Sequence, residues 1–202
     1  MRIVCFCLIA AAGAGAERCA DAVTPIGREI VQEMNLLRQD PPGYAMKLAE
    51  LLPLYRGKQR RLGPREYLQT EEGPAAVEEA LAVLRRTPPR QHVAFEPCLA
   101  RSALDHVEDT GPRGLFGHDG SQGGKLKGRI TRYLPKYRMI GENIDYGSPS
   151  ARDVVFSLIV DDGVPDRGHR HNMLEPDFNA AGAACGPHRQ MRQMCVIDFM
   201  RR

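Results

Sequence analysis

The first sixteen residues constrain the fold most. They indicate how long the folded chain is and whether it folds in an oxidising or a reducing compartment. Arg2 precedes an apolar run from Ile3 to Ala12, and small residues ending in Ala14-Gly15-Ala16 follow. This order is typical of a secretory signal peptide, and about ten apolar residues are too few to span a bilayer. We therefore predict cleavage after Ala16 and a secreted protein, extracellular or periplasmic, with a single domain over 17–202. The alternative, a buried N-terminal helix, agrees less well with the sequence, because the small residues are followed directly by the polar Glu17 and Arg18.

Four cysteines remain after residue 16: Cys19, Cys98, Cys185 and Cys195. An even number in an exported chain suggests disulfides, and four cysteines allow three pairings. We expect Cys185–Cys195 together with Cys19–Cys98, because Cys185 and Cys195 lie in two strand-like runs separated by a turn. Four free thiols in a cytosolic protein are the alternative. No spacing matches a structural zinc knuckle.

The charge balance is close to even, at +3 for the whole chain. Such a balance implies no dedicated nucleic-acid surface, and the short basic cluster at 58–61 is expected to be a solvated loop. No stretch after residue 16 is apolar enough for a membrane span.

Apolar residues at helical spacing predict several helices. Thr24 and Pro25 form a start signal for the first, which ends before Pro41. Further helices are expected over 43–52, 74–86 and 97–109, and a helix starting at the capping pair Ser150 and Asp153 should end at 161–163. Residues 53–73 are basic and rich in Gly and Pro, which predicts a loop or an insertion.

Extended structure is predicted at 91–95 and 139–144, and two strands over 180–186 and 194–200 are expected to form a terminal hairpin. Glycines are dense from Gly111 to Gly128, which indicates an irregular and functional loop. The result is an α+β protein, in which helices flank a small and mainly antiparallel sheet.

Histidine is scarce, and two histidines lie in unusual surroundings. His118 occupies a glycine-flanked turn, and His169 follows the loop that ends a helix. Between them, Glu142 is a carboxylate in an apolar extended segment. Each residue alone has an ordinary explanation, as a hydrogen-bonding scaffold residue or an ion-pair partner. His171, two residues beyond His169, is expected to be a surface residue.

Asp161 and Asp162 close the helix before His169. A carboxylate at a helix C-terminus opposes the macrodipole, at a cost of about 0.3–1 kcal/mol per charge. A nearby histidinium or metal ion would favour at least one of these acids at this position.

The motifs gain weight from their order along the chain. They are F-G-H-D-G-S (116–121), R-I-T-R-Y (129–133), G-E-N-I (141–144), V-V-F-S-L-I-V-D-D-G-V (154–164), R-G-H-R-H-N-M-L (167–174), A-A-G-A-A-C-G (180–186) and M-C-V-I-D-F (194–199), with E-M-N-L-L-R (33–38) upstream. This series resembles the CAP superfamily, the cysteine-rich secretory, antigen-five and pathogenesis-related group of SCP-like extracellular proteins. The resemblance covers about 26–200, and 53–90 is a variable, insertion-like segment.

The resemblance implies an α–β–α sandwich with a surface cavity lined by two histidines and two acids. By position these are His118, His169, Glu142 and Asp161. In the family the second acid is usually a Glu three residues after a Trp, whereas this chain has Leu158 and Asp161. The shorter Asp side chain leaves Asp162 as a possible substitute.

Two imidazoles with flanking carboxylates suit a weakly bound divalent cation such as Zn²⁺, with the acids as ligands or as acceptors for the other ring N–H. We expect a non-catalytic or weakly catalytic CAP module that binds metal and a small ligand. The ligand class is left open between a lipid and a polysaccharide. A metal-assisted hydrolase with Glu142 as general base and an inert extracellular scaffold are the alternatives. No H-E-x-x-H or G-x-S-x-G motif supports catalysis.

Overall fold

The computed structural model describes residues 19–202, so the predicted signal peptide and its cleavage site lie outside the described residues. The helices and strands follow one another as η1 (Ala20–Ala22), α2 (Pro25–Gln39), α3 (Pro41–Leu48), η2 (Ala49–Leu54), β1 (Tyr55–Arg56), β2 (Gln59–Arg61), β3 (Tyr67–Gln69), α4 (Pro74–Leu84), β4 (Ala94–Phe95), α5 (Pro97–Thr110), η3 (Gly111–Arg113), α6 (Leu126–Tyr133), β5 (Met139–Tyr146), α7 (Ala151–Val160), α8 (Gly168–Leu174), β6 (Ala180–His188) and β7 (Arg192–Arg201).

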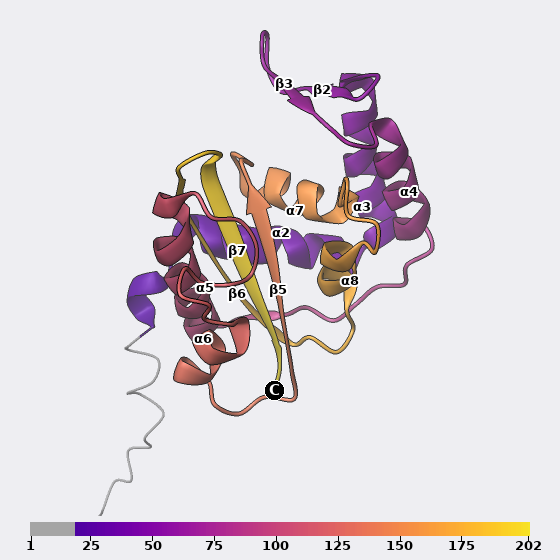
Figure 1. Ribbon diagram of the computed structural model, residues 1–202. Helices are drawn as coiled ribbons and strands as arrows, with labels where there is room; N and C mark the ends of the chain where they lie inside the picture. The colour runs from indigo at the N-terminus through magenta and orange to yellow at the C-terminus, as the bar shows by residue number, and fades with distance from the viewer. Residues whose placement is uncertain (1–18) are drawn as a thin grey trace, which may run out of the picture.

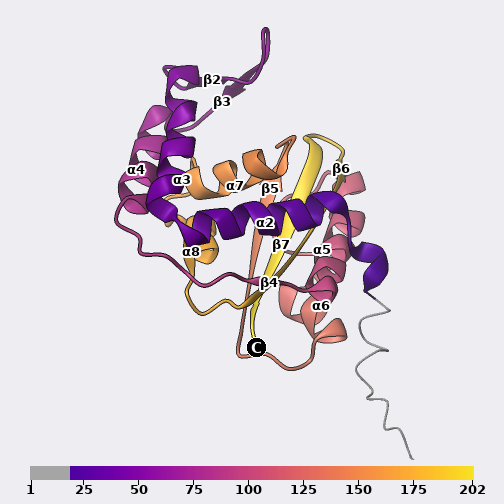
Figure 2. The same ribbon diagram turned by 180° about the vertical axis from the view of Figure 1, so that it is seen from behind.

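A four-stranded sheet in the order β4-β6-β7-β5 forms the centre of the molecule. β6 and β7 form the expected hairpin, β5 pairs antiparallel with β7, and only β4 runs parallel to its neighbour β6. Helix α2 crosses one face, as Figure 2 shows, and α5 and α6 cover the other face (Figure 1). The α+β sandwich that the sequence predicts is therefore confirmed.

The strands separate the core into two halves, because successive side chains of a strand point to opposite faces. Odd-numbered residues of β7 such as Ile197 and Phe199 join the large core beneath α2, α3, α4 and α7. Even-numbered residues such as Val196 and Met200 pack instead against α5 and α6. A residue's position in its strand thus determines which layer of helices it meets.

The local helix signals operate as expected. The Thr24 hydroxyl accepts a hydrogen bond from the backbone N–H of Gly27 at 3.2 Å, and Pro25 occupies the first turn of α2. The Ser150 hydroxyl accepts one from the backbone N–H of Asp153, which caps α7. Side-chain caps replace hydrogen bonds that the first turn of a helix cannot make internally.

Of the loop or insertion predicted over 53–73, the loop alternative is wrong. Residues 55–69 form a small antiparallel sheet in the order β1-β2-β3, which extends from the body of the protein (Figure 1). The strands are two or three residues long and mostly exposed, so they lack the apolar alternation that makes a strand visible in sequence. Helices α6 and α8 were also not anticipated, and both are short.

Both expected disulfides are present. Cys19 pairs with Cys98 and so ties the start of the described chain to α5, whereas Cys185 and Cys195 face each other across the β6–β7 hairpin. Within residues 19–202, no helix has the length and apolarity needed to cross a membrane.

Candidate functional site

The structure arranges the four residues predicted for the site as two histidine–carboxylate pairs. His118 Nδ1 lies 2.8 Å from Glu142 Oε1, and His169 Nδ1 lies 2.6 Å from Asp161 Oδ1. In each pair the carboxylate is buried and the imidazole is more accessible, with side-chain exposures of 53% for His118 and 24% for His169. Both histidines are therefore oriented through Nδ1 while the other ring nitrogen, Nε2, remains available.

The first pair is anchored by an arginine that sequence analysis did not single out. Arg129 of α6 forms an ion pair with Glu142 and donates a second hydrogen bond to the carbonyl oxygen of His118 at 3.1 Å. Burial acts to raise the pKa of Glu142, but His118 and Arg129 outweigh it and lower that pKa. The hydrogen bond to Glu142 raises the pKa of His118. The pair therefore favours an imidazolium beside a carboxylate.

A fully buried carboxyl group lies behind this pair. Asp198 of β7 is the cross-strand neighbour of Glu142, and the two side chains share the face covered by α5 and α6. Burial, and then the negative charge of Glu142, raise the pKa of Asp198 well above its ordinary value. Ser102 and His106 of α5 line the same region, and polar side-chain atoms of all three residues lack a hydrogen-bond partner among residues 19–202.

Because Asp198 holds its proton in the folded state more tightly than in the unfolded state, its contribution to stability is complete below the ordinary pKa of about 3.9 and is lost as pH rises through the folded pKa. An Asp198→Asn variant keeps the shape but has no proton to lose. We expect its free energy of unfolding, relative to the parent, to increase steadily above about pH 4. Urea unfolding of both proteins between pH 3 and pH 8 measures this difference. Glu78→Gln, at an exposed position of α4, controls for loss of one charge. An unchanged difference across that range contradicts a buried neutral Asp198.

The second pair forms where α7 ends. Asp161 takes a left-handed backbone conformation (φ 57°), which turns its carboxylate back toward the start of α8. Besides the His169 ring, this carboxylate accepts hydrogen bonds from the backbone N–H groups of His169 at 3.0 Å and Arg170 at 3.2 Å. The histidine and the first backbone N–H groups of α8 thus provide the favourable partners that an acid at a helix C-terminus requires.

The carboxylate of Asp162 has other hydrogen-bond partners than the histidines. Its two carboxylate oxygens accept hydrogen bonds from the backbone N–H groups of Glu71 and Glu72, at 2.7 and 2.9 Å. Of the two adjacent acids, only Asp161 is the hydrogen-bond partner of His169. His171 lies exposed on α8, as expected.

Two arginines hold the loop that carries the second pair. Arg170 is buried, donates to the carbonyl oxygens of Ile159 and Val160 at 2.6 and 2.9 Å, and forms an ion pair with Glu79 of α4. Arg167 forms ion pairs with Glu79 and Glu72. The positions of Asp161 and His169 therefore depend on α4, which is distant in sequence.

The two pairs lie beside the same outer strand of the sheet. β5 is the last strand in the sheet order, and Glu142 points to the α5 and α6 face. The next residue, Asn143, donates from its side chain to the carbonyl oxygen of His169 at 2.9 Å. Asn172 of α8 donates to the carbonyl oxygen of Glu142 at 3.3 Å and to the Asn143 side chain at 2.9 Å. Helix α8 is thereby fastened to this strand.

The donor set fits a divalent cation only through the imidazoles. A histidine whose Nδ1–H is held by a carboxylate is oriented to present Nε2 to a metal ion, and the carboxylate then acts on the histidine instead of the metal. Across the described residues, no three His, Cys, Asp or Glu side chains converge as a metal-binding group. Glu142 and Asp161 therefore accept hydrogen bonds from the rings of His118 and His169 and orient both imidazoles.

Sequence signals exist for some of the residues that were missed. Asp198 is a charged residue within an otherwise apolar strand, a pattern that by itself suggests a buried polar role. Arg129, Arg167 and Arg170 offer no such signal, because this chain contains many arginines and their partners are remote in sequence.

Comparison with known proteins gives a family and a set of similar structures. A search of curated proteins yields no match. Among solved structures, the chain is similar to an outer surface protein from Borrelia burgdorferi, with 18% identity, 56% of this chain and 80% of the other covered, and a TM-score of 0.48. It is also similar to an extracellular protein containing an SCP domain from Bacillus anthracis, with 21% identity, 60% of this chain and 37% of the other covered, and a TM-score of 0.47. A third similar structure is a cysteine-rich secretory protein from Staphylococcus aureus, with 15% identity, 77% of this chain and 49% of the other covered, and a TM-score of 0.44.

The chain spans less than half the length of the last two proteins. The sequence model of the CAP family, described as the cysteine-rich secretory protein family, matches residues 78–199. These residues contain both histidine–carboxylate pairs and more than half of the chain. The protein therefore belongs to the CAP, or cysteine-rich secretory protein, family.

Proposed function

We propose that this protein is an exported CAP module in which His118 and His169 bind a divalent cation weakly and reversibly. The observation that carries the proposal is the pair of Nδ1–carboxylate hydrogen bonds, at 2.8 and 2.6 Å, because they orient both imidazoles and leave Nε2 free. The attachment of α8 to the outer strand supports it further. Export is supported by the N-terminal residue pattern, the two disulfides and the extracellular character of the family.

When bound, such a cation would supply a Lewis-acidic centre at the outer edge of the sheet. The chain's own part is to orient the rings: Glu142, held by Arg129, accepts from His118, and Asp161 accepts from His169. Hydrolysis with Glu142 as general base is less well supported, because this side chain is 1% exposed and is already bonded to His118 and Arg129.

Zinc binding should depend steeply on pH. Both imidazoles must lose a proton to bind, so affinity is expected to fall by up to about a hundredfold per pH unit below both histidine pKa values. Since Glu142 raises the pKa of His118, proton competition should begin above the ordinary histidine value of about 6.5. Calorimetric titration with Zn²⁺ at pH 7.5 and pH 5.5 measures the effect.

Three variants and one control make this experiment specific. His118→Ala and His169→Ala should each abolish measurable zinc binding, since one imidazole alone is a poor site. Asp161→Asn should weaken binding less, because the amide oxygen can still accept from His169. His171→Ala, on the same helix as His169, is the matched control and should bind as the parent does. Parent-like affinity in either His118→Ala or His169→Ala would show that the pairs are packing features of an inert scaffold.

A further inference from the structure

A pocket of about 250 Å³ lies between the small sheet and the body of the protein. The small sheet contributes Tyr55, Arg60 and Leu68, and the body contributes Tyr146, Asp161 and His169. Residues 55–69 lie outside the part of the chain that matches the CAP family, residues 78–199. One wall of this pocket therefore lies outside the residues that match the family model, whereas the opposite wall, with His169, lies inside them.

The carboxylates that border the pocket already accept hydrogen bonds from other groups of the protein. Asp161 accepts from the His169 ring and from two backbone N–H groups, and Asp162 accepts from two others. Asp145 accepts from the backbone N–H and the hydroxyl of Ser148, at 3.3 and 2.9 Å. The acids lining this pocket are thus engaged inside the protein and leave few acceptors for a cationic ligand.

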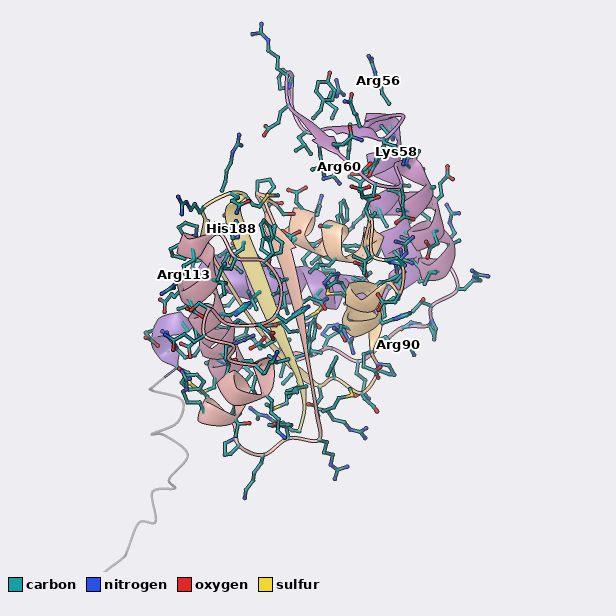
Figure 3. All side chains as sticks on the ribbon, in the orientation of Figure 1. Arg56, Lys58, Arg60, Arg90, Arg113 and His188 are labelled. Atoms are coloured by element: carbon teal, nitrogen blue, oxygen red, sulfur yellow. A yellow bond between two sulfur atoms is a disulfide. The ribbon has the colours of Figure 1, made fainter. Side chains whose placement is uncertain are left out.

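Arg60 is in the opposite situation. It pairs with Tyr55 and Leu68 across the small sheet, and its Nε–H is buried without a hydrogen-bond partner in the described chain. No carboxylate of residues 19–202 forms an ion pair with it, and its guanidinium is hydrogen-bonded to the Tyr55 hydroxyl. In Figure 3, Arg60 lies on the side of the small sheet that faces α7, whereas Arg56 points away from the body. A permanently charged guanidinium without a carboxylate partner thus lines the pocket.

We propose that this pocket binds the carboxylate or phosphate group of a small molecule, with Arg60 as the residue that recognises the anion. An oxyanion matches the guanidinium fork, and no carboxylate of residues 19–202 competes with it for Arg60. The volume is below the range of about 300–1,000 Å³ typical of sites that enclose a drug-sized ligand, so the bound group is small. The inference does not rest on the proposed cation, because Arg60 is not a metal ligand, although His169 lines this pocket as well.

The test is an NMR titration of the ¹⁵N-labelled protein with sodium acetate and, separately, inorganic phosphate. Sodium chloride at matched ionic strength is the third arm. We expect the Arg60 Nε–H signal and the amide signals of the pocket to shift and saturate with at least one oxyanion. Saturation by acetate alone assigns a carboxylate, and saturation by phosphate alone assigns a phosphate group.

Variants on the same strand determine whether Arg60 is responsible. Arg60→Gln should weaken oxyanion binding by about tenfold or more, and Arg60→Lys, which keeps the charge without the fork, should fall between Arg60→Gln and the parent. Arg61→Gln is the matched control, because this exposed neighbour points to the other face of β2. Amide spectra outside the pocket verify that each variant is folded.

The proposal is overturned if neither oxyanion saturates, if chloride causes the same shifts, or if Arg60→Gln binds as tightly as Arg61→Gln. Zinc titration of Arg60→Gln separates the two proposals. We expect this variant to bind zinc like the parent while losing the oxyanion. The failure of zinc binding in the parent would leave the oxyanion result intact.

Discussion

Replacing Arg38 with methionine is expected to lower the free energy of unfolding by about 3–5 kcal/mol. Arg38 has no exposed surface and donates to four carbonyl oxygens: those of Gln91 (2.8 Å), Met173 (2.9 Å), Glu175 (3.0 Å) and Phe178 (3.4 Å). Burial lowers the pKa of Arg38 to about 10, so the side chain remains charged at neutral pH. Methionine fills much of the volume but leaves these buried acceptors without a donor.

The same substitution should affect the site, because two of the carbonyl groups belong to the end of α8 and the residue after it. Helix α8 carries His169, so faster amide hydrogen exchange is expected there. Arg85→Met, at an exposed position just after α4, is the matched control and should be close to neutral. Urea unfolding measures both variants, and a difference of less than about 1 kcal/mol between them would contradict the role assigned to Arg38.

Loss of the Cys19–Cys98 disulfide is the second large effect that we expect. This bridge spans 79 residues, whereas Cys185–Cys195 spans 10. In the chain-entropy description, a longer closed loop restricts the unfolded chain more, which gives about 4.5 kcal/mol for the first bridge and about 2.7 kcal/mol for the second. The Cys19→Ala/Cys98→Ala variant should therefore lose more stability than Cys185→Ala/Cys195→Ala.

The two bridges also differ in the other contacts that hold their cysteines in place. Cys185 and Cys195 are already held opposite each other by the hydrogen bonds of the β6–β7 hairpin. Cys19, in contrast, ties a one-turn helix, η1, to α5. Denaturant unfolding of the two double variants provides the comparison. Equal losses, or a larger loss for the hairpin bridge, would show that loop length does not govern the stabilisation.

Local signals in the sequence determined those elements whose stabilising contacts join residues close together in the chain. Thr24 and Pro25 specify the start of α2, and Ser150 specifies the start of α7, because a cap and its N–H group are neighbours in the chain. The β6–β7 hairpin and its disulfide followed from two adjacent runs of suitable length. The ordered motifs also identified the family and the four residues of the two pairs.

Only the tertiary structure decided how these residues are connected. Asp161 and Asp162 are adjacent in sequence, yet the left-handed turn at Asp161 gives one carboxylate to His169 and the other to the backbone before α4. Arg129 reaches Glu142 from another helix, and Arg60 reaches the pocket from a small sheet that the sequence suggested was a loop. A polar side chain does not carry the identity of its partner, because that partner is brought close only when segments distant in sequence pack against one another. For this protein, the sequence determined the family and the four residues of the two pairs, and the packing of α4, α6, α8 and the small sheet determined what each of them contacts.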